Sequence, residues 1–318
     1  MSTFTGLLLI VLPVFLLVGC GYATVRFRAF PDKGIDALIA FATNIAVPAL
    51  LFRAIYTLDL GAALDAGHLM AFYGGALVCF VGATLVSRMV WRRRPGESVA
   101  VGFSALFSNS VLLGLPIFER AFGAAAMEPV FALIAFHAPF CYLVGIMTME
   151  FLRRDGLPIR VAMIRSAKAM FKNGLMLGIA LGFLFNIGGV PVPGPVSDVI
   201  DMLAAAALPV ALFGLGGVLT RYRMRAEIGE ALMVSVFSLI AHPLLAYVVA
   251  AHVFALDDGF VRSAVLIAAM PPGVNGYIFA AMYDRAVGTA ASTVLLATAL
   301  SVFTTTLWLG FLGGGAFG

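Results

Sequence analysis

The chain of 318 residues is 62% hydrophobic and only 11% charged, with a mean hydropathy of +1.05. Soluble globular domains carry about 25% charged residues, so this composition excludes that class and predicts an integral membrane protein. The net charge of +4 does not indicate nucleic-acid binding, because the basic residues occupy short connections beside apolar runs, where membrane topology accounts for them.

Apolar runs of roughly 20 residues, the length that crosses a bilayer as a helix, follow one another along the chain. Their breaks predict ten transmembrane helices at residues 4–25, 35–56, 68–90, 99–118, 127–152, 174–190, 196–220, 230–254, 260–283 and 289–312. The first run lacks a basic start and is too long for the core of a signal peptide, so we expect it to remain as the first helix. The fold class predicted is an all-α membrane protein with one membrane domain.

The connections between the ten predicted helices alternate between two sides. Of the 20 lysines and arginines, all but Arg53, Arg120 and Arg262 fall on one side. The positive-inside rule assigns that side to the cytoplasm, so both termini are expected to face out. The longest basic connection, residues 153–172, is predicted as an interfacial amphipathic helix that joins two halves.

The two halves of the chain carry similar short segments. Residues 47–52 read Val-Pro-Ala-Leu-Leu-Phe and residues 208–213 read Leu-Pro-Val-Ala-Leu-Phe; residues 119–123 and 284–288 form a second such pair. Five helices per half is an odd number, so the second copy must be inverted relative to the first. We therefore expect a first repeat at 1–154, a cytoplasmic basic linker at 155–172 and a second, inverted repeat at 173–318.

The fourth and ninth predicted helices are interrupted by polar residues, glycines and prolines. A proline inside a helix removes one backbone donor and clashes with the carbonyl four residues earlier, so the helix must bend or open. Two interrupted helices in corresponding halves indicate a transporter's binding site. The alternative is a pair of ordinary kinks at which small residues pack helix against helix. The residues concerned are Ser108, Asn109, Ser110 and Pro116 in the fourth helix, and Pro271, Pro272, Gly273, Asn275 and Tyr277 in the ninth.

If both helices open, the second half of each begins inside the bilayer. Its first N–H groups are then unpaired and face the break with the positive end of the helix dipole. Such ends attract anions without any lysine or arginine. The carbonyls that Pro271 and Pro272 set free would hold a cation or water. Side chains of Ser108, Asn109, Ser110, Asn275 and Tyr277 would add donors to this site.

Titratable residues within the predicted helices are few. No acidic residue lies at the middle of a helix, so a proton relay through a central carboxylate is not expected. His137 and His242 lie near the middle of the fifth and eighth helices, and a histidine can carry a coupling proton near neutral pH. The alternative for each is a hydrogen bond to a neighbouring helix.

Signatures of enzymes are missing from the sequence. It has no glycine-rich phosphate loop, no HExxH and no nucleophile elbow. We therefore expect neither an enzyme nor an ATP-driven pump, and neither a cofactor nor a metal.

Two of these segments resemble motifs of the auxin efflux carrier family. Residues 109–116, Asn-Ser-Val-Leu-Leu-Gly-Leu-Pro, are similar to its Asn-Thr-x-x-x-Gly-[Ile/Leu]-Pro segment, and residues 269–274, Ala-Met-Pro-Pro-Gly-Val, to its Ala-Leu-Pro-x-Gly-[Ile/Val] segment. The resemblance implies two inverted five-helix repeats in which broken helices four and nine cross. It also implies a scaffold of helices one, two, six and seven, a mobile transport domain made of the others, and a homodimer through the scaffold. By position, it assigns Asn109, Pro116, Pro271, Gly273 and Asn275 to the substrate site.

The chain departs from the plant members of that family in having Ser108 before the asparagine and a short central connection. It resembles the short bacterial members, which are assigned to small carboxylates such as malonate or malate. The resemblance thus implies a secondary transporter of small organic anions in a bacterial inner membrane, with both termini periplasmic. We expect an elevator-type movement driven by the membrane potential or by a proton or sodium gradient. Two alternatives stay open: a receptor or sensor that binds the same ligand without transport, and a sodium-coupled carrier of the bile-acid type.

Overall fold

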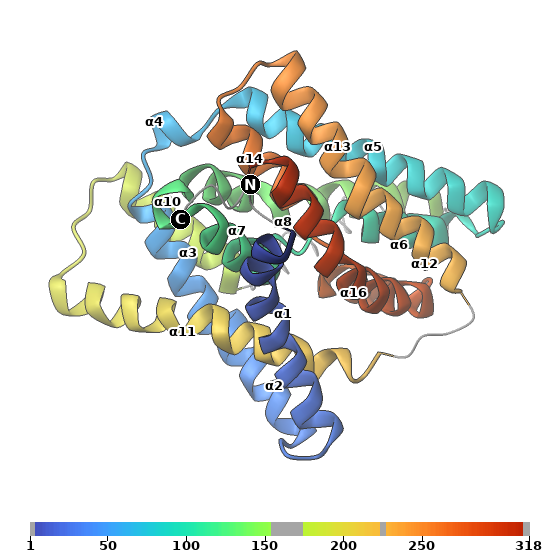
Figure 1. The fold of residues 1–318 in the computed structure, drawn as a ribbon, viewed down its shortest axis with the longest axis horizontal. Helices are drawn as coiled ribbons and strands as arrows, with labels where there is room; N and C mark the ends of the chain where they lie inside the picture. The colour runs from blue at the N-terminus through green and yellow to red at the C-terminus, as the bar shows by residue number, and fades with distance from the viewer. Residues whose placement is uncertain (1–3, 154–173, 223–226, 314–318) are drawn as a thin grey trace. The chain divides into compact units, whose positions relative to one another are not determined.

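The computed structural model describes residues 4–153, 174–222 and 227–313, and within them every regular element is helical apart from one isolated bridge between Ser108 and Pro272 (Figure 1). In this described part of the chain, seven helices are long and apolar enough to cross a membrane. They are Phe4–Arg26, Asp32–Tyr56, Ala66–Val90, Glu128–Leu152, Gly194–Leu219, Ile228–Val253 and Val287–Phe311. They coincide with the first, second, third, fifth, seventh, eighth and tenth predicted helices. The chain is a multi-pass membrane protein.

The other three predicted helices are short or divided. The sixth is α10, Gly174–Ile187. The fourth consists of α6 (Pro95–Leu106), the π-helical turn η2 (Ser110–Gly114) and α7 (Leu115–Phe122). The ninth consists of α14 (Asp258–Ala268) and α15 (Val274–Tyr283), so both interruptions predicted from the sequence are present. The linker predicted at 155–172 lies outside the described residues.

The helices group into two compact units, and each unit draws on both halves of the chain. The smaller unit holds α1 (Phe4–Arg26) from Pro13 onward, with α2 (Asp32–Phe41), η1 (Ala42–Ala46), α3 (Val47–Tyr56), α4 (Leu60–Ala63), α10 and α11 (Gly194–Leu219). The larger unit holds the start of α1 with α5 (Ala66–Val90), α6, η2, α7, η3 (Ala124–Ala126), α8 (Glu128–Arg153), α12 (Ile228–Val236), η4 (Phe237–Ala241), α13 (His242–Tyr247), η5 (Val248–Val253), α14, α15 and α16 (Val287–Phe311).

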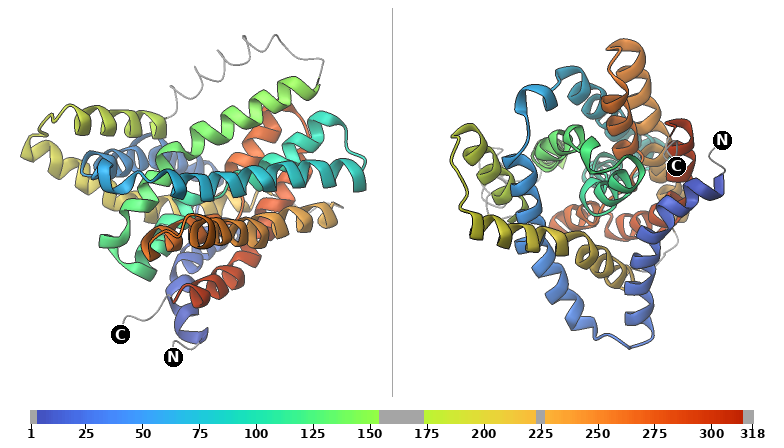
Figure 2. Two further views of the ribbon diagram at one scale, coloured as in Figure 1. Left: turned by 90° about the horizontal axis from the view of Figure 1, so that it is seen from above. Right: turned by 60° about the vertical axis from the view of Figure 1, so that its left-hand side comes forward.

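Within the smaller unit, α11 crosses α2 and α3, and α10 packs along α3 (Figure 2). Glycines let α1 approach α11 closely, and α10 approach α3. A Cβ on Gly21 would lie 1.9 Å from the carbonyl oxygen of Phe213, and one on Gly178 would lie 2.3 Å from that of Pro48. Small residues at such contacts are typical of helix packing in membranes.

Two sets of ion pairs join α11 to the helix formed by α2, η1 and α3. Near the end of α3, Arg53 pairs with Asp201 of α11 over 3.1 Å. Just beyond the end of α11, Arg221 pairs with Asp36 and Asp32 of α2 over 2.6 and 3.0 Å. In each case an arginine at the C-terminal end of one helix, where a positive charge is favourable, meets an aspartate from the other half of the chain. The two sets are similar in kind but not in position, since Arg53 lies five residues after Pro48 and Arg221 twelve residues after the corresponding Pro209.

Three prolines near the starts of helices follow π-helical turns. Pro48, Pro116 and Pro243 each lie two residues after the last residue of η1, η2 and η4, respectively. In a regular α-helix each proline would clash with the carbonyl four residues earlier, and here that carbonyl lies inside the π-helical turn. The extra residue of such a turn widens the helix there, so the helix continues past the proline.

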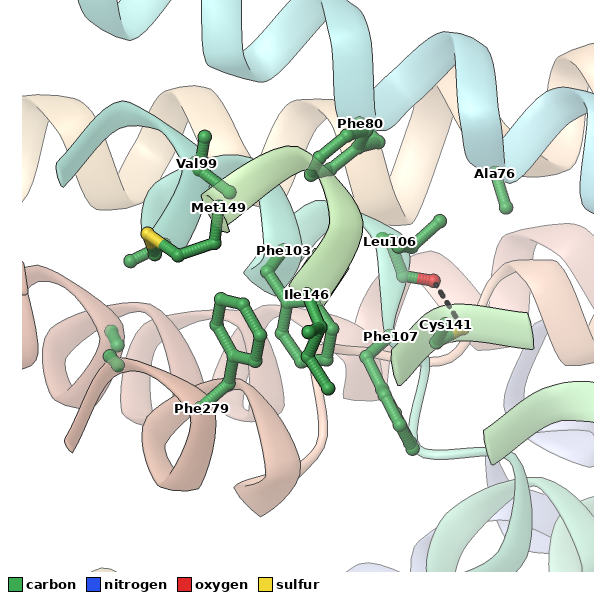
Figure 3. Packing of buried hydrophobic residues seen from close by; sticks show 13 residues of the cluster. Ala76, Phe80, Val99, Phe103, Leu106, Phe107, Cys141, Ile146, Met149 and Phe279 are labelled. Atoms are coloured by element: carbon green, nitrogen blue, oxygen red, sulfur yellow. Dashed lines mark hydrogen bonds between the residues drawn. The ribbon is translucent and has the colours of Figure 1, made fainter. Parts of the chain in front are cut away.

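One buried hydrophobic cluster of the larger unit joins the two divided helices to α8 (Figure 3). Phe103 of α6 stacks on Phe279 of α15, with ring centroids 3.8 Å apart and planes 12° from parallel. A Cβ on Gly145 of α8 would lie 2.4 Å from the Phe103 ring, so α8 reaches this pair only because it has a glycine there. The thiol of Cys141, also on α8, donates to the carbonyl of Leu106, the last residue of α6.

Candidate functional site

The two interrupted segments pair with each other. The Asn109 N–H donates to the carbonyl oxygen of Pro271 over 2.8 Å, and the Gly273 N–H donates to that of Phe107 over 3.1 Å. Ser108 and Pro272 lie opposite each other in the resulting antiparallel bridge. An opened backbone inside a bilayer must find partners, and here each interruption supplies them for the other. We call residues 107–109 together with residues 271–273 the crossing.

The positions of the two breaks agree only in part with the sequence prediction. The break between α14 and α15 contains Pro271 and Pro272, as expected. The other break comes where α6 ends and Phe107 turns extended, with φ −96° and ψ 91°. Pro116 lies downstream, inside α7, so it does not open the fourth helix. The pairing with residues 271–273 fixes this break, and the turn η2 accommodates the proline.

Two helices begin at the crossing. One starts at Ser110 and runs through η2 into α7, and the other is α15, which starts at Val274. In the first, the N–H groups of Leu113 and Gly114 bond back to the carbonyl of Asn109, over 3.3 and 3.1 Å. The N–H groups of the residues before Leu113 come ahead of the first hydrogen bond of the helix, as in any first turn. They carry the positive end of the helix dipole. Such an end favours an anion.

Several predicted site residues gather at these helix starts. Ser108, Asn109 and Ser110 are all buried, and the Asn109 side chain lies against Gly273, where an added Cβ would be 3.6 Å from both Cα and Cβ of Asn109. Asn275 belongs to the first turn of α15, and its Oδ1 accepts a hydrogen bond from the Tyr142 hydroxyl over 3.2 Å.

His137 also lies at the crossing. Its Nε2 is 3.1 Å from the carbonyl oxygen of Ser108, and its ring meets that of Phe107 edge-on at 4.7 Å. Because a carbonyl can only accept, Nε2 carries the proton of the neutral ring and Nδ1 keeps its lone pair. The Sγ atom of Cys141 is 3.8 Å from that Nδ1. The protonated nitrogen of His137 therefore contacts the bridge between the two divided helices, and the other nitrogen faces Cys141.

Other predicted residues lie apart from the crossing. His242 bonds through Nε2 to the carbonyl oxygen of Phe72 over 3.0 Å. The Phe72 ring contacts both His242 and His137, at centroid distances of 4.9 and 5.6 Å, so the two histidines share one aromatic neighbour. Tyr277 packs its ring against Tyr222 at 4.8 Å.

The sequence analysis missed Tyr142. Its hydroxyl orients the side chain of Asn275, and its ring packs on both Phe103 and Phe107. No sequence signal connects Tyr142 to Asn275, because they lie 133 positions apart and a tyrosine in an apolar helix is unexceptional.

Comparisons with known proteins agree with this architecture. The profile of the family described as "Membrane transport protein" matches residues 7–158 and again residues 158–309. The chain is 28% identical over 319 residues to a protein of Rhizobium meliloti named "Putative malonate transporter", covering 99% of this chain and 98% of that protein. It is 26% identical over 305 residues to a protein of Methanothermobacter thermautotrophicus named "Uncharacterized transporter", covering 94% and 96%.

Proposed function

Because the chain belongs to the membrane transport protein family, which contains the auxin efflux carriers, we propose that it is a secondary transporter of small organic anions. The family is one of transporters and not of enzymes. The substrates we propose are mono- and dicarboxylates such as malonate or malate. Full-length similarity to the Rhizobium meliloti protein, whose name includes malonate, supports that class.

The observation that carries this proposal is the crossing. A carboxylate bound there would meet the first-turn N–H groups of two helices, both with the positive end of the dipole toward it. The amides of Asn109 and Asn275 would add neutral donors. We propose that the substrate site comprises Ser108, Asn109, Ser110, Pro271, Gly273 and Asn275, with Pro116 and Tyr277 supporting it from α7 and α15.

We propose that ten transmembrane helices form two inverted repeats, at 1–154 and 173–318, joined by the linker at 155–172. The double match of the family profile supports a repeat. So does the crossing, because exchanging the halves of the chain maps one of its two backbone bonds onto the other.

An elevator-type movement is the proposed mechanism. The larger unit holds the third, fourth, fifth, eighth, ninth and tenth helices, the set expected to form the transport domain. The smaller unit holds the second, sixth and seventh with most of the first, the set expected to form the scaffold. In our proposal the larger unit moves, the scaffold forms a homodimer, and the protein lies in the inner membrane with both termini periplasmic.

His137 supports a proton as the coupling ion. An anion at the crossing and a proton on His137 would stabilise each other, since opposite charges a few ångströms apart favour each other's charged forms. Binding of either then strengthens binding of the other by the same factor. His242, which shares Phe72 with His137, is the second candidate. A sodium-coupled carrier is the alternative within transporters.

Uptake by the purified protein in proteoliposomes tests the proposal. Labelled malonate, malate and indole acetate are offered under a proton gradient, a sodium gradient or a potassium diffusion potential, each imposed alone. We expect accumulation of malonate or malate under the proton gradient or the diffusion potential. Accumulation under the sodium gradient alone would support the bile-acid type of carrier. Binding of malonate with no flux under any gradient would overturn transport in favour of a receptor.

A further inference from the structure

Three consecutive arginines in the connection between α5 and α6 differ in their surroundings. Arg92 and Arg94 are exposed, whereas the Arg93 side chain is only 21% exposed and turns inward to Glu230. From the charge distribution alone, all three arginines would be interpreted as signals of membrane topology. One of them has a second role, which the sequence does not reveal.

Glu230, in the first turn of α12, is completely buried. Its carboxylate accepts hydrogen bonds from the Ser87 hydroxyl at 2.6 Å, from Nε and Nη2 of Arg93 at 3.0 and 2.8 Å, and from the Thr289 hydroxyl at 3.1 Å. Glu227 also contacts Arg93 and Thr289, at 3.1 and 3.0 Å. A buried carboxylate needs such complete pairing to be tolerated. We call these five residues the Arg93 cluster.

The Arg93 cluster ties four elements of the larger unit together at one point. Ser87 lies in the last turn of α5, and Arg93 lies in the connection that leads into α6. Glu230 lies in the first turn of α12, and Thr289 lies in the first turn of α16. The hydrogen bonds that Arg93 donates to Glu230 raise the pKa of Arg93 above its ordinary value, so the guanidinium stays charged and both of its N–H groups remain donors to the carboxylate.

The Arg93 cluster is connected through helices to both segments of the crossing. From Pro95, two positions after Arg93, α6 runs for 12 residues to Leu106, which immediately precedes the crossing. At 1.5 Å per residue this is a rod of about 18 Å. The other segment of the crossing leads into α15, which packs against both α6 and α16. The first turn of α16 holds Thr289.

We propose that the Arg93 cluster positions the crossing by holding α6 at one depth relative to α12 and α16, so that Phe107 stays opposite Gly273. Arg93 and Glu230 are thus positioning residues. Their effect on substrate affinity rests on the proposed function, whereas their effect on the geometry of the crossing does not.

Hydrogen exchange tests this inference without any substrate. The amide protons of Asn109 and Gly273 are bonded across the crossing, so peptides covering residues 104–114 and 268–278 report whether it stays closed. Arg93→Gln is compared with Arg93→Lys, which keeps the charge and loses the fork, and with Arg92→Gln, which removes the exposed neighbouring charge. We expect exchange in both peptides to be at least about tenfold faster in Arg93→Gln, intermediate in Arg93→Lys and unchanged in Arg92→Gln.

Faster exchange confined to residues 84–98 and 227–236 would show that the cluster acts only locally and would overturn the proposal. An equal increase over the whole chain would do the same, because it would reflect a general loss of stability. If Arg93→Gln does not yield folded protein, the double variant Arg93→Gln/Glu230→Gln replaces it, since it leaves no unpaired carboxylate in the interior. We expect that variant to fold and still to exchange faster at the crossing.

Transport kinetics then connect the geometry to the substrate. For the folded fraction of Arg93→Gln, the KM for malonate is expected to rise at least about fivefold, with a smaller change for Arg93→Lys. An unchanged KM together with an opened crossing would show that the crossing is not the binding site. If the unaltered protein transports no carboxylate, the proposed function fails while the exchange result still decides the role of the cluster.

Discussion

The backbone N–H of Asn109 donates to the carbonyl oxygen of Pro271, and this bond has a counterpart between Gly273 and Phe107. Exchanging the two halves of the chain maps one bond onto the other, with Ser108 and Pro272 at the centre. This relationship is the one expected if the two halves are the inverted repeats that we propose. It also uses only backbone atoms, so the side chain of Asn109 is not needed to hold the two segments together.

The Asn109→Ala variant is expected to fold normally and to bind substrate more weakly. Its backbone bonds are kept, so its melting temperature should stay within a few degrees of the unaltered protein. Loss of one hydrogen bond to a carboxylate costs about 1.5–3 kcal/mol, which predicts roughly a tenfold to hundredfold rise in KM for malonate. Proteoliposome uptake and thermal unfolding measure the two effects. If Asn109→Ala and Asn275→Ala both leave uptake unchanged, the proposed site is wrong.

Asn186, in the smaller unit, is the control asparagine for Asn109 and Asn275. Its Nδ2 lies 2.9, 2.9 and 2.8 Å from the carbonyl oxygens of Ile55, Tyr56 and Leu58, which share its two N–H donors, so it caps the end of α3 from a neighbouring helix. Asn186→Ala is expected to lower the free energy of unfolding by about 1–3 kcal/mol. The KM for malonate should not change. A large change in KM without a loss of stability would contradict this assignment.

Tyr142 is expected to act through Asn275. Replacing it with phenylalanine keeps the aromatic packing and removes only the hydroxyl that donates to Asn275 Oδ1. The amide is then free to rotate, and we expect a severalfold rise in KM with little change in stability. Combining Tyr142→Phe with Asn275→Ala should add nothing to the effect of Asn275→Ala alone, because the hydroxyl then has no partner to orient. Additive effects on KM would show that Tyr142 acts in some other way.

The core around Phe103 predicts opposite outcomes for two glycines. A Cβ on Gly145 would lie 2.4 Å from the ring of Phe103, which is completely buried and stacked on Phe279. Gly145→Ala should therefore destabilise the protein by about 1–3 kcal/mol. Gly74 lies inside α5, and a Cβ there would meet nothing within 4 Å. Gly74→Ala should be neutral or stabilising by up to about 1 kcal/mol, since alanine favours helix. Thermal unfolding in detergent compares the two directly.

The lengths of the apolar runs predicted most of the fold, because a membrane helix can be identified from the residues of its own segment. The two interruptions were visible for the same reason: Pro271 and Pro272 cannot continue a helix. The exact break in the fourth helix was not visible, because Pro116 lies inside α7 and pairing with residues 271–273 sets the end of α6. The position of such a break depends on partners that are distant in the sequence, and the residue pattern of one segment does not identify those partners.

The candidate site was predictable to a similar extent. Ser108, Asn109 and Gly273 were marked by their polarity or conformational freedom inside apolar runs, and the structure brings them together. Tyr142 and the ion pair of Arg93 with Glu230 were not predictable. Each depends on a contact between positions more than a hundred residues apart, and each residue type has an ordinary explanation in its own segment.

His137 gives the sharpest test of the coupling ion. In His137→Gln the side-chain amide can still donate to the carbonyl of Ser108, but it has no nitrogen that binds a proton at neutral pH. Exchange of labelled for unlabelled malonate across the membrane should therefore persist, whereas accumulation driven by a proton gradient should be lost. His252→Gln is the matched control, because His252 is an exposed histidine of the same unit, and it should accumulate malonate like the unaltered protein. If His137→Gln still accumulates malonate under a proton gradient alone, His137 does not carry the coupling proton, and His242→Gln becomes the variant to measure.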